Sequence, residues 1–218
     1  MKLHTVFITY NRLELTKQAI ESYLETRPAG LPDFTYMVVD NGSTDGTAEW
    51  LIDLGAPVEW LGENRYPGYA TNLGWGAEFV EADFLHRADN DFAFLPGWCE
   101  EVERIFQSKK VGQVGLRTDQ EEMFAAWNVG GNCVIRRELW DMGLRYDERP
   151  WTEYPPGYSE DSFFSPEVER LGYTWTRVKR PCIRSLASGD LSDPYYQKSY
   201  GDRRIIDPDS IKQQLGTK

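Results

Sequence analysis

Short apolar runs alternate with helical segments through the first half of the chain, and this alternation constrains the fold most. The runs are rich in β-branched and aromatic residues, as buried strands are, and they cover Thr5–Thr9, Tyr36–Val39, Val58–Leu61 and Phe84–Ala88. Between them, apolar residues recur at helical spacing, first over residues 15–24, where Asn11 is expected to cap the helix. Repeated strand–helix–strand units imply right-handed crossovers. The sequence therefore predicts an α/β fold with a mostly parallel sheet flanked by helices.

The second half continues this pattern without a convincing linker or an internal repeat. Helices are expected at residues 98–106 and 161–171, and strands at 111–116, 129–136 and 173–178. We therefore expect one domain over residues 1–185. Residues 186–218 are polar and tyrosine-bearing, and we expect them to form a tail that packs on or near the functional site.

Composition excludes several classes of protein. The 218 residues are 40% hydrophobic, which excludes a disordered chain, and the net charge of −11 argues against non-specific binding to DNA or anionic membranes. The three cysteines form no CxxC pair, so neither a disulfide framework nor a zinc knuckle is indicated. No apolar run is long enough to span a membrane, and the N-terminus does not resemble a signal peptide. We expect a cytoplasmic protein.

Polar side chains follow each of the first four predicted strands. They are Tyr10-Asn11-Arg12, Asp40-Asn41, Glu63-Asn64 and Asp89-Asn90-Asp91. In open α/β sheets, ligands bind beyond the carboxyl ends of the strands, so these side chains are expected to line one site. The chain has neither a GxGxxG segment after the first strand nor a GxxxxGK[ST] loop, so a dinucleotide or P-loop site is not indicated.

Asp89 and Asp91 suggest a cation site. In an extended segment, residues i and i+2 point the same way, so the two carboxylates repel each other unless a cation lies between them. Oxygen ligands of this kind suit Mg²⁺ or Mn²⁺. The alternative is an ordinary turn, because Asp and Asn are common turn residues.

Five segments, in this order, resemble those of family 2 glycosyltransferases, which have the GT-A fold. The segments are TYNR (9–12), VVDNGSTDGT (38–47), ENRYPGYATNLGWG (63–76), DND (89–91) and SED (159–161). The resemblance covers about residues 5–175, so residues 1–109 are expected to form the half that binds a nucleotide-sugar donor and residues 110–185 the acceptor half.

The resemblance implies roles for individual residues. It places Thr9, Tyr10, Asn11, Arg12, Asp40, Asn64, Gly68, Asn72, Asp89 and Asn90 at the donor, with Asp40 on the base and Asp89 facing the ribose or the metal. Asp91 would bind a divalent cation, Mn²⁺ or Mg²⁺, that bridges the diphosphate. Glu160 and Asp161 match the catalytic acidic pair, with Asp161 as the base.

The role of Asp161 has an independent physical argument. An inverting transfer needs a base, on the face opposite the departing diphosphate, that takes the proton of the acceptor hydroxyl. A carboxylate at the start of a helix is held in place, and the helix dipole favours its charged form. The residues alone favour an ordinary acidic first turn of a helix, and the resemblance reverses that preference.

Aromatic residues and glycines near the acidic pair are candidates for binding the acceptor. They are Trp127, Gly130, Gly131, Trp151, Tyr154 and Tyr158. Aromatic faces suit sugars and bases, and glycine permits close approach of the backbone. Packing in the core or in a loop is the alternative for about half of the aromatic residues.

One feature departs from the family pattern. Many GT-A enzymes carry a metal-binding histidine after the acidic pair, but His4 and His86 both lie upstream of it. Either Asp190 or water replaces that histidine, or the dependence on metal is weaker. A basic cluster at residues 177–184 could contact the diphosphate or an anionic acceptor, or be a solvated strand edge.

These observations favour a metal-dependent, inverting glycosyltransferase that uses a nucleotide diphosphate sugar, with a UDP-sugar preferred. The acceptor is a hydroxyl of a glycan, a protein or a modified nucleobase, and a nucleic-acid acceptor is possible but not favoured. A non-catalytic module that binds nucleotide sugars or glycans is the main alternative. A nucleotidyltransferase is ranked low, because TYNRLEL (9–15) is not a glycine-rich basic loop. Residues 1–109 carry 8 basic and 18 acidic side chains, so donor binding is expected to weaken sharply in chelator.

Overall fold

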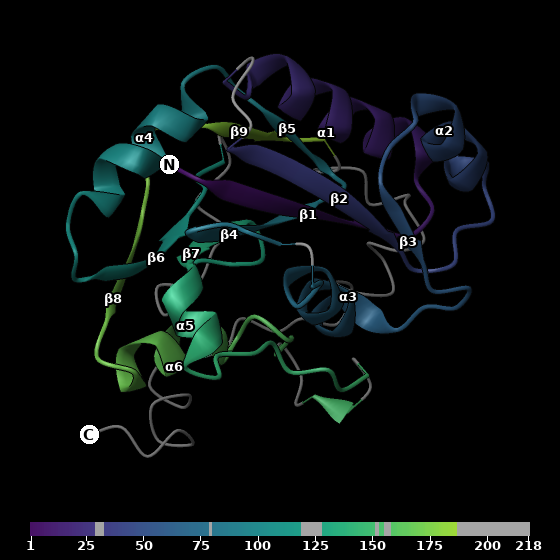
Figure 1. Ribbon diagram of the computed structural model, residues 1–218. Helices are drawn as coiled ribbons and strands as arrows, with labels where there is room; N and C mark the ends of the chain where they lie inside the picture. The colour runs from purple at the N-terminus through teal and green to yellow at the C-terminus, as the bar shows by residue number, and fades with distance from the viewer. Residues whose placement is uncertain (29–32, 79, 119–127, 151–152, 155–157, 187–218) are drawn as a thin grey trace.

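The structure is a computed structural model (Figure 1), and it describes residues 1–28, 33–78, 80–118, 128–150, 153–154 and 158–186. Its centre is a seven-stranded sheet with the order β3-β2-β1-β4-β7-β6-β8. The strands are β1 (Leu3–Thr9), β2 (Phe34–Asp40), β3 (Val58–Trp60), β4 (Phe84–Asp89), β6 (Val111–Gly115), β7 (Cys133–Arg136) and β8 (Thr174–Arg177). Only β7 runs antiparallel to its neighbours in this sheet. The predicted fold class, a mostly parallel sheet flanked by helices in a single domain, is confirmed.

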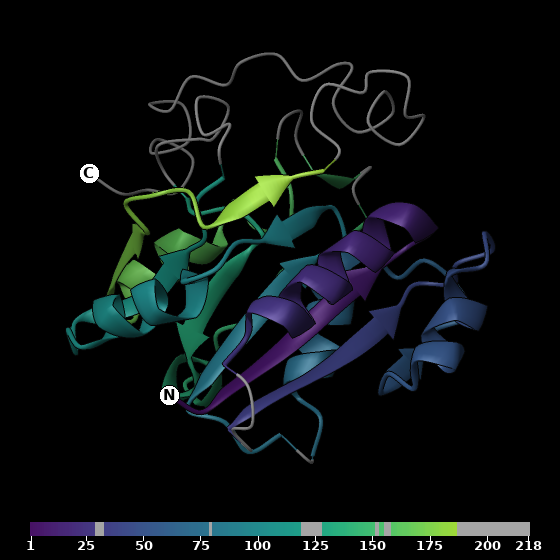
Figure 2. The same cartoon turned by 90° about the horizontal axis from the view of Figure 1, so that it is seen from above.

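Helices cover both faces of the sheet (Figures 1 and 2). One face carries α1 (Leu13–Thr26), α2 (Thr47–Leu54) and α4 (Trp98–Phe106), and the other carries α3 (Tyr66–Trp75), α5 (Arg137–Asp141) and α6 (Phe164–Arg170). Strand β1 is buried throughout. Leu3 and Phe7 pack in the core between the sheet and helices α1 and α4, and Val6 and Ile8 pack in the core between the sheet and helices α3 and α6. This alternation follows from the period of two along a strand.

The strand register brings the carboxyl ends of the central strands together. Thr9 pairs with Asp40 across β1 and β2, and Ile8 pairs with Asp89 across β1 and β4. The parallel strands therefore deliver Thr9, Asp40 and Asp89 to the same edge of the sheet, as the sequence predicts.

The start of α1 differs from the prediction, because Asn11 is not its cap. Asn11 and Arg12 have φ angles of 55° and 63°, and the Asn11 side chain accepts a hydrogen bond from the Thr44 amide instead. The first amide of α1, that of Leu13, donates to the Asp45 carboxylate, which also accepts from the amide of Thr47 at the start of α2. Asp45, which lies 32 residues after Leu13, thus binds the first backbone amide of both α1 and α2.

Two predicted helices are shorter than expected. The sequence predicts a helix over residues 67–82, but α3 ends at Trp75, and the helix predicted from Asp161 begins only at Phe164. A second sheet, absent from the prediction, pairs β5 (Phe92–Phe94) with β9 (Ile183–Ser185) in antiparallel fashion. Leu186 then donates its amide to the carbonyl of Asp91 at 2.8 Å, so the described chain ends beside the DND segment. Within the described residues, no helix has the length and apolarity needed to cross a membrane.

Candidate active site

The loop after β2 is organised by the carboxylate of Asp40. Asp40 is 2% exposed and accepts hydrogen bonds from the amides of Gly42 and Ser43 at 3.0 and 2.9 Å. It also accepts from the hydroxyls of Thr9 and Ser43 at 2.9 and 2.6 Å. The side chains of Thr9 and Asp40 therefore hold the ends of β1 and β2 together, and their contact with a nucleotide base stays a prediction.

The end of β1 turns sharply into α1, and the side chain of Asn90 stabilises this turn by hydrogen bonds. The Asn90 amide donates to the Asn11 carbonyl at 3.2 Å and to the Thr16 hydroxyl at 2.9 Å, at a position only 8% exposed. Tyr10 lies partly buried at the same turn. Asn90 therefore serves the shape of the loop within the protein, rather than presenting its amide at the surface.

Arg12 and Asp91 form an ion pair at this edge, with 3.1 Å between Nη1 and Oδ2. Their side chains are only 12% and 15% exposed. Burial, and then the charge of Asp89, raise the pKa of Asp91 to about 6 despite the opposing effect of Arg12. The charge of Asp89 thus acts on Asp91, but Asn90 and Asp91 lie in a turn and not in an extended segment, and a cation between the two carboxylates stays a prediction.

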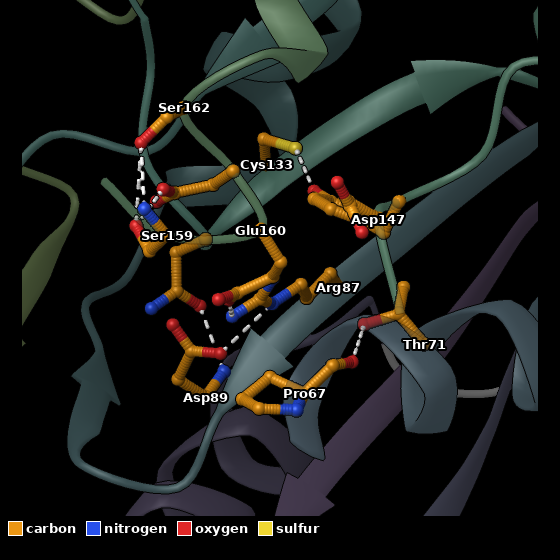
Figure 3. Close-up of polar contacts among 12 residues, drawn as sticks. Pro67, Thr71, Arg87, Asp89, Cys133, Asp147, Ser159, Glu160 and Ser162 are labelled. Carbon is orange, nitrogen blue, oxygen red and sulfur yellow. Dashed lines mark hydrogen bonds and ion pairs between the residues drawn. The ribbon is translucent and has the colours of Figure 1, made fainter. Parts of the chain in front are cut away.

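Arg87 connects the DND segment to the acidic pair (Figure 3). Its Nε donates to Asp89 at 3.0 Å and its Nη2 donates to Glu160 at 2.8 Å. Burial alone lowers the pKa of Arg87, but the charges of Asp89 and Glu160 raise it well above its ordinary value. Sequence reasoning missed Arg87. The available signal was an arginine inside a strand predicted to be buried, two positions before Asp89 and therefore on the same face.

Glu160 and Asp161 lie in a turn and not in the first turn of a helix. The Ser162 amide donates to the Ser159 carbonyl, the Ser159 amide donates to the Ser162 hydroxyl, and α6 begins only at Phe164. The expected dipole effect on Asp161 is therefore wrong. Burial, and then the charge of Glu160, raise the pKa of Asp161, although Arg87 and a 2.5 Å hydrogen bond from the Ser159 hydroxyl oppose this shift.

Three residues that the resemblance assigns to the sugar donor lie in or just before α3: Asn64, Gly68 and Asn72. Asn64 is exposed and accepts from the amide of Tyr66 at the start of α3. Asn72 is 8% exposed and pairs with the backbone of Tyr146, donating to its carbonyl at 2.9 Å and accepting from its amide at 3.0 Å. A Cβ on Gly68 would lie 2.0 Å from the carbonyl oxygen of Asp147. Gly68 and Asn72 therefore fix α3 against the segment that leads to the acidic pair.

The acceptor candidates are only partly described. Trp127 and Trp151 lie outside the described residues. Tyr154 and Tyr158 are each 7% exposed. The Tyr154 hydroxyl donates to the Asp147 carbonyl at 3.3 Å, and the Tyr158 ring stacks on that of Phe163. These contacts match the packing alternative for the two rings.

Of the two glycines of the acceptor prediction, Gly131 lies against the Arg87–Asp89 pair. The amide of Gly130 donates to the Asn128 side chain at 3.0 Å. A Cβ on Gly131 would lie 2.6 Å from the Asp89 carboxylate and 2.8 Å from the Arg87 guanidinium. The absence of a side chain at Gly131 therefore makes room for the Arg87–Asp89 pair.

An open depression of about 330 Å³ lies at the opposite end of β4, beside Phe84. Four of its charged side chains already pair with each other, Arg136 with Glu138 at 3.9 Å and Arg137 with Asp141 at 3.1 Å. The carboxyl edge instead holds carboxylates with perturbed pKa values, which are typical of catalytic sites.

The carboxylate oxygens at the carboxyl edge of the sheet meet part of the coordination that a hard divalent cation needs. Within the described residues, no three His, Cys, Asp or Glu side chains are grouped closely enough to hold a metal alone. Mg²⁺ and Mn²⁺ commonly use one or two carboxylates and complete their coordination with water and substrate phosphate. Asp91 and Asp89 would supply such a pair, but each already pairs with an arginine, Asp91 with Arg12 at 3.1 Å and Asp89 with Arg87 at 3.0 Å, so their role as cation ligands stays a prediction.

Comparison with solved structures identifies related folds. The chain aligns over 99% of its length with 68% of the mannosyltransferase PcManGT from Pyrobaculum calidifontis, solved with GDP-Man and Mn²⁺ (TM-score 0.72, 15% identity). It aligns over 85% of its length with 58% of S. aureus TarS 1–349, solved with UDP-GlcNAc (0.68, 15%). It aligns over 81% of its length with 69% of glucosyl-3-phosphoglycerate synthase from Mycobacterium tuberculosis, solved with Mg²⁺ and UDP (0.57, 19%).

At these identities, the likeness concerns the fold, and the chain spans only 36% of the longer TarS chain. No curated protein matches the sequence. The sequence profile described as Glycosyl transferase family 2 matches residues 5–155, which is more than half of the chain. The chain belongs to glycosyl transferase family 2.

Proposed function

We propose that the chain is an inverting glycosyltransferase that moves a sugar from a nucleotide diphosphate donor to an acceptor hydroxyl, with a divalent cation at the donor site. The observation that carries this proposal is the meeting of two acidic segments at the carboxyl edge of the sheet. Arg87 joins Asp89 of the DND segment to Glu160 of the SED segment by hydrogen bonds of 3.0 and 2.8 Å. Membership of glycosyl transferase family 2 supports the reaction class.

In this proposal, residues 1–109 bind the donor. The loops after β1 and β2, joined by the Thr9–Asp40 hydrogen bond, face the nucleotide, and Arg12 lies where it can approach the diphosphate. Asp91, with Asp89 beside it, holds Mn²⁺ or Mg²⁺. When bound there, the cation would supply charge neutralisation for the departing diphosphate, an effect worth several kcal/mol in metal enzymes.

Asp161 acts as the general base in this proposal. Its Oδ1 already accepts from the Ser159 hydroxyl at 2.5 Å, so Oδ2 is the atom that accepts the proton of the acceptor hydroxyl. Its raised pKa makes it a better proton acceptor than an ordinary aspartate, because base strength increases with pKa. Glu160 is held by Arg87, which leaves Asp161 as the member of the pair that can take the proton.

The ligands of the neighbouring structures support the choice of donor. Those structures contain UDP, UDP-GlcNAc or GDP-Man together with, in two cases, Mn²⁺ or Mg²⁺. A UDP-sugar is our first choice of donor, and residues 110–185 with the candidates Gly130 and Gly131 form the acceptor half. The acceptor belongs to the class of hydroxyls on a glycan, a protein or a modified nucleobase.

A donor screen tests the proposal. UDP-GlcNAc, GDP-mannose and further nucleotide sugars are added with and without Mn²⁺, and the rise in Tm reports binding. We expect one donor to raise Tm only with metal, and its slow hydrolysis or transfer to release the nucleotide diphosphate. Donor binding without hydrolysis, and without transfer to any acceptor tried, would favour the non-catalytic module.

Asp161→Asn tests the assigned base. We expect this variant to retain donor affinity and Tm but to lose about 10²–10⁴ of the turnover rate, because it removes general-base catalysis. Asp53→Asn, at an exposed position of α2, is the matched control and should turn over normally. Undiminished turnover in Asp161→Asn would remove Asp161 from this role.

A further inference from the structure

Arg87 is placed to do more than balance charge, because it joins two segments that are distant in the sequence. It lies on β4, 73 residues before Glu160, and is 3% exposed. Its Nε holds the Asp89 carboxylate, and its Nη2 holds the Glu160 carboxylate (Figure 3). One planar group therefore sets the separation of the two acidic segments.

The surroundings fix the orientation of the guanidinium. It lies over the ring of Tyr146 at 4.9 Å, and that ring is stacked on Phe164 with 3.9 Å between ring centroids. On another side, the missing Cβ of Gly131 makes room for Nη2. An arginine held by both aromatic packing and directed hydrogen bonds loses little freedom when substrate binds, which favours preorganisation.

One nitrogen of the Arg87 guanidinium makes no hydrogen bond within the described part of the chain. Its Nη1 is buried and has no hydrogen-bond partner among the residues that the structure describes. Arg136 offers a contrast within the same sheet, because its guanidinium donates to the backbone carbonyls of Phe106, Ser108 and Val111. Arg136 therefore binds only backbone carbonyls in these contacts, whereas Arg87 binds carboxylates of the candidate site.

We propose that Arg87 is a positioning residue for sugar transfer, which holds the Ser159–Ser162 turn against the carboxyl end of β4 so that the base meets the donor at a fixed distance. This inference rests on the proposed function. Arg87 acts through Glu160 and Asp89, and the reacting atoms remain those of the substrates and Asp161. A misplacement of about 1 Å at such a site can lower turnover about 10²-fold.

Arg87→Lys is the variant that tests this role, since lysine keeps the charge but replaces the planar fork by a single ammonium group. We expect kcat, measured as nucleotide release from UDP-GlcNAc or GDP-mannose with Mn²⁺, to fall about 10²-fold. We expect the Kd of the same donor, measured by calorimetry, to stay close to that of the wild type. Arg136→Lys is the matched control, and it should lower Tm while leaving kcat unchanged.

A double-mutant cycle with Glu160→Gln gives a second measurement. If the two residues act as one unit, the double variant loses no more kcat than the worse single variant, because coupled effects are not additive. Should Arg87→Lys fail to fold, Glu160→Gln alone must show the same loss of kcat with donor affinity retained.

Three results would overturn the inference: fully additive losses of kcat, a parallel loss of donor affinity and kcat, or an Arg87→Lys variant that turns over like Arg136→Lys. Wild-type protein that neither binds nor turns over any donor would instead refute the proposed function, and the inference with it.

Discussion

The buried carboxylate of Asp40 provides the sharpest test of how the donor-side loop is held. Asp40→Ala leaves three donors without their acceptor: the hydroxyl of Thr9, a fully buried residue, and the part-buried amides of Gly42 and Ser43. A buried donor left unsatisfied costs about 1–3 kcal/mol, with the part-buried amides at the low end, so the three together should reduce the free energy of unfolding by about 4 kcal/mol. For a chain of this size, 1 kcal/mol corresponds to about 2–4 °C, so Tm should fall by about 8–16 °C.

Asp45→Ala is the matched control for this prediction. Asp45 also accepts from two backbone amides, those of Leu13 and Thr47, and from the Thr47 hydroxyl. It lies at an exposed position, where water can replace the lost acceptor, so its removal should cost only about 1 kcal/mol. Thermal and urea unfolding, followed by tryptophan fluorescence at pH 7, measure both losses. Equal losses in the two variants would refute the argument that burial decides the cost.

Three further perturbations have a stated direction. Burial lowers the pKa of His86 from 6.5 to about 3, so between these values the unfolded chain binds a proton that the folded chain does not. This group therefore makes stability fall as the pH falls, by about 1.4 kcal/mol per unit, and His86→Gln should remove that contribution from the pH slope of urea titrations. Gly68→Ala should lower Tm, because its Cβ would lie 2.0 Å from the Asp147 carbonyl and overpacking costs about 1–3 kcal/mol. Chelator should weaken donor binding, because Asp89 and Asp91 then face the diphosphate without a cation, and calorimetry with and without EDTA measures the change.

Each of these expectations has a result that contradicts it. His4, whose pKa is also lowered by burial, to about 4, is present in wild type and His86→Gln alike, so equal pH slopes in the two would exclude His86 as a source. Alanine in place of glycine ordinarily stabilises a helix interior, so a higher Tm in Gly68→Ala would show that α3 can move away. Equal donor affinity with and without EDTA would contradict a metal-dependent donor site.

Much of the sheet could be predicted because its signal is local. The apolar runs of β1, β2 and β4 are buried strands, and the polar residues after them lie at one edge because parallel strands end together. The positions of Asp40, Asp89 and Asp91 at that edge required no tertiary information beyond the strand order. Their predicted ligand contacts stay predictions.

Helix starts were less predictable, because side chains from other segments decide them. Asn11 is a common capping residue, yet Asp45 caps α1 from a loop 32 residues away. The acidic pair resembles the first turn of a helix, yet the mutual hydrogen bonds of Ser159 and Ser162 form a separate turn. This difference reverses the expected electrostatics of Asp161, since burial raises its pKa where a helix dipole would lower it.

The sequence by itself determined the strands of the central sheet along the chain, the acidic character of the site and the family, but not the second sheet of β5 and β9. These properties depend on residue type and on spacing along the chain, both of which are read directly. Only the tertiary structure identified Arg87 as the link between Asp89 and Glu160, and Asn72 as an anchor for Tyr146. Both contacts span more than 70 residues along the chain, and they form because the packing of the sheet and helices buries these groups together, where each must find a partner.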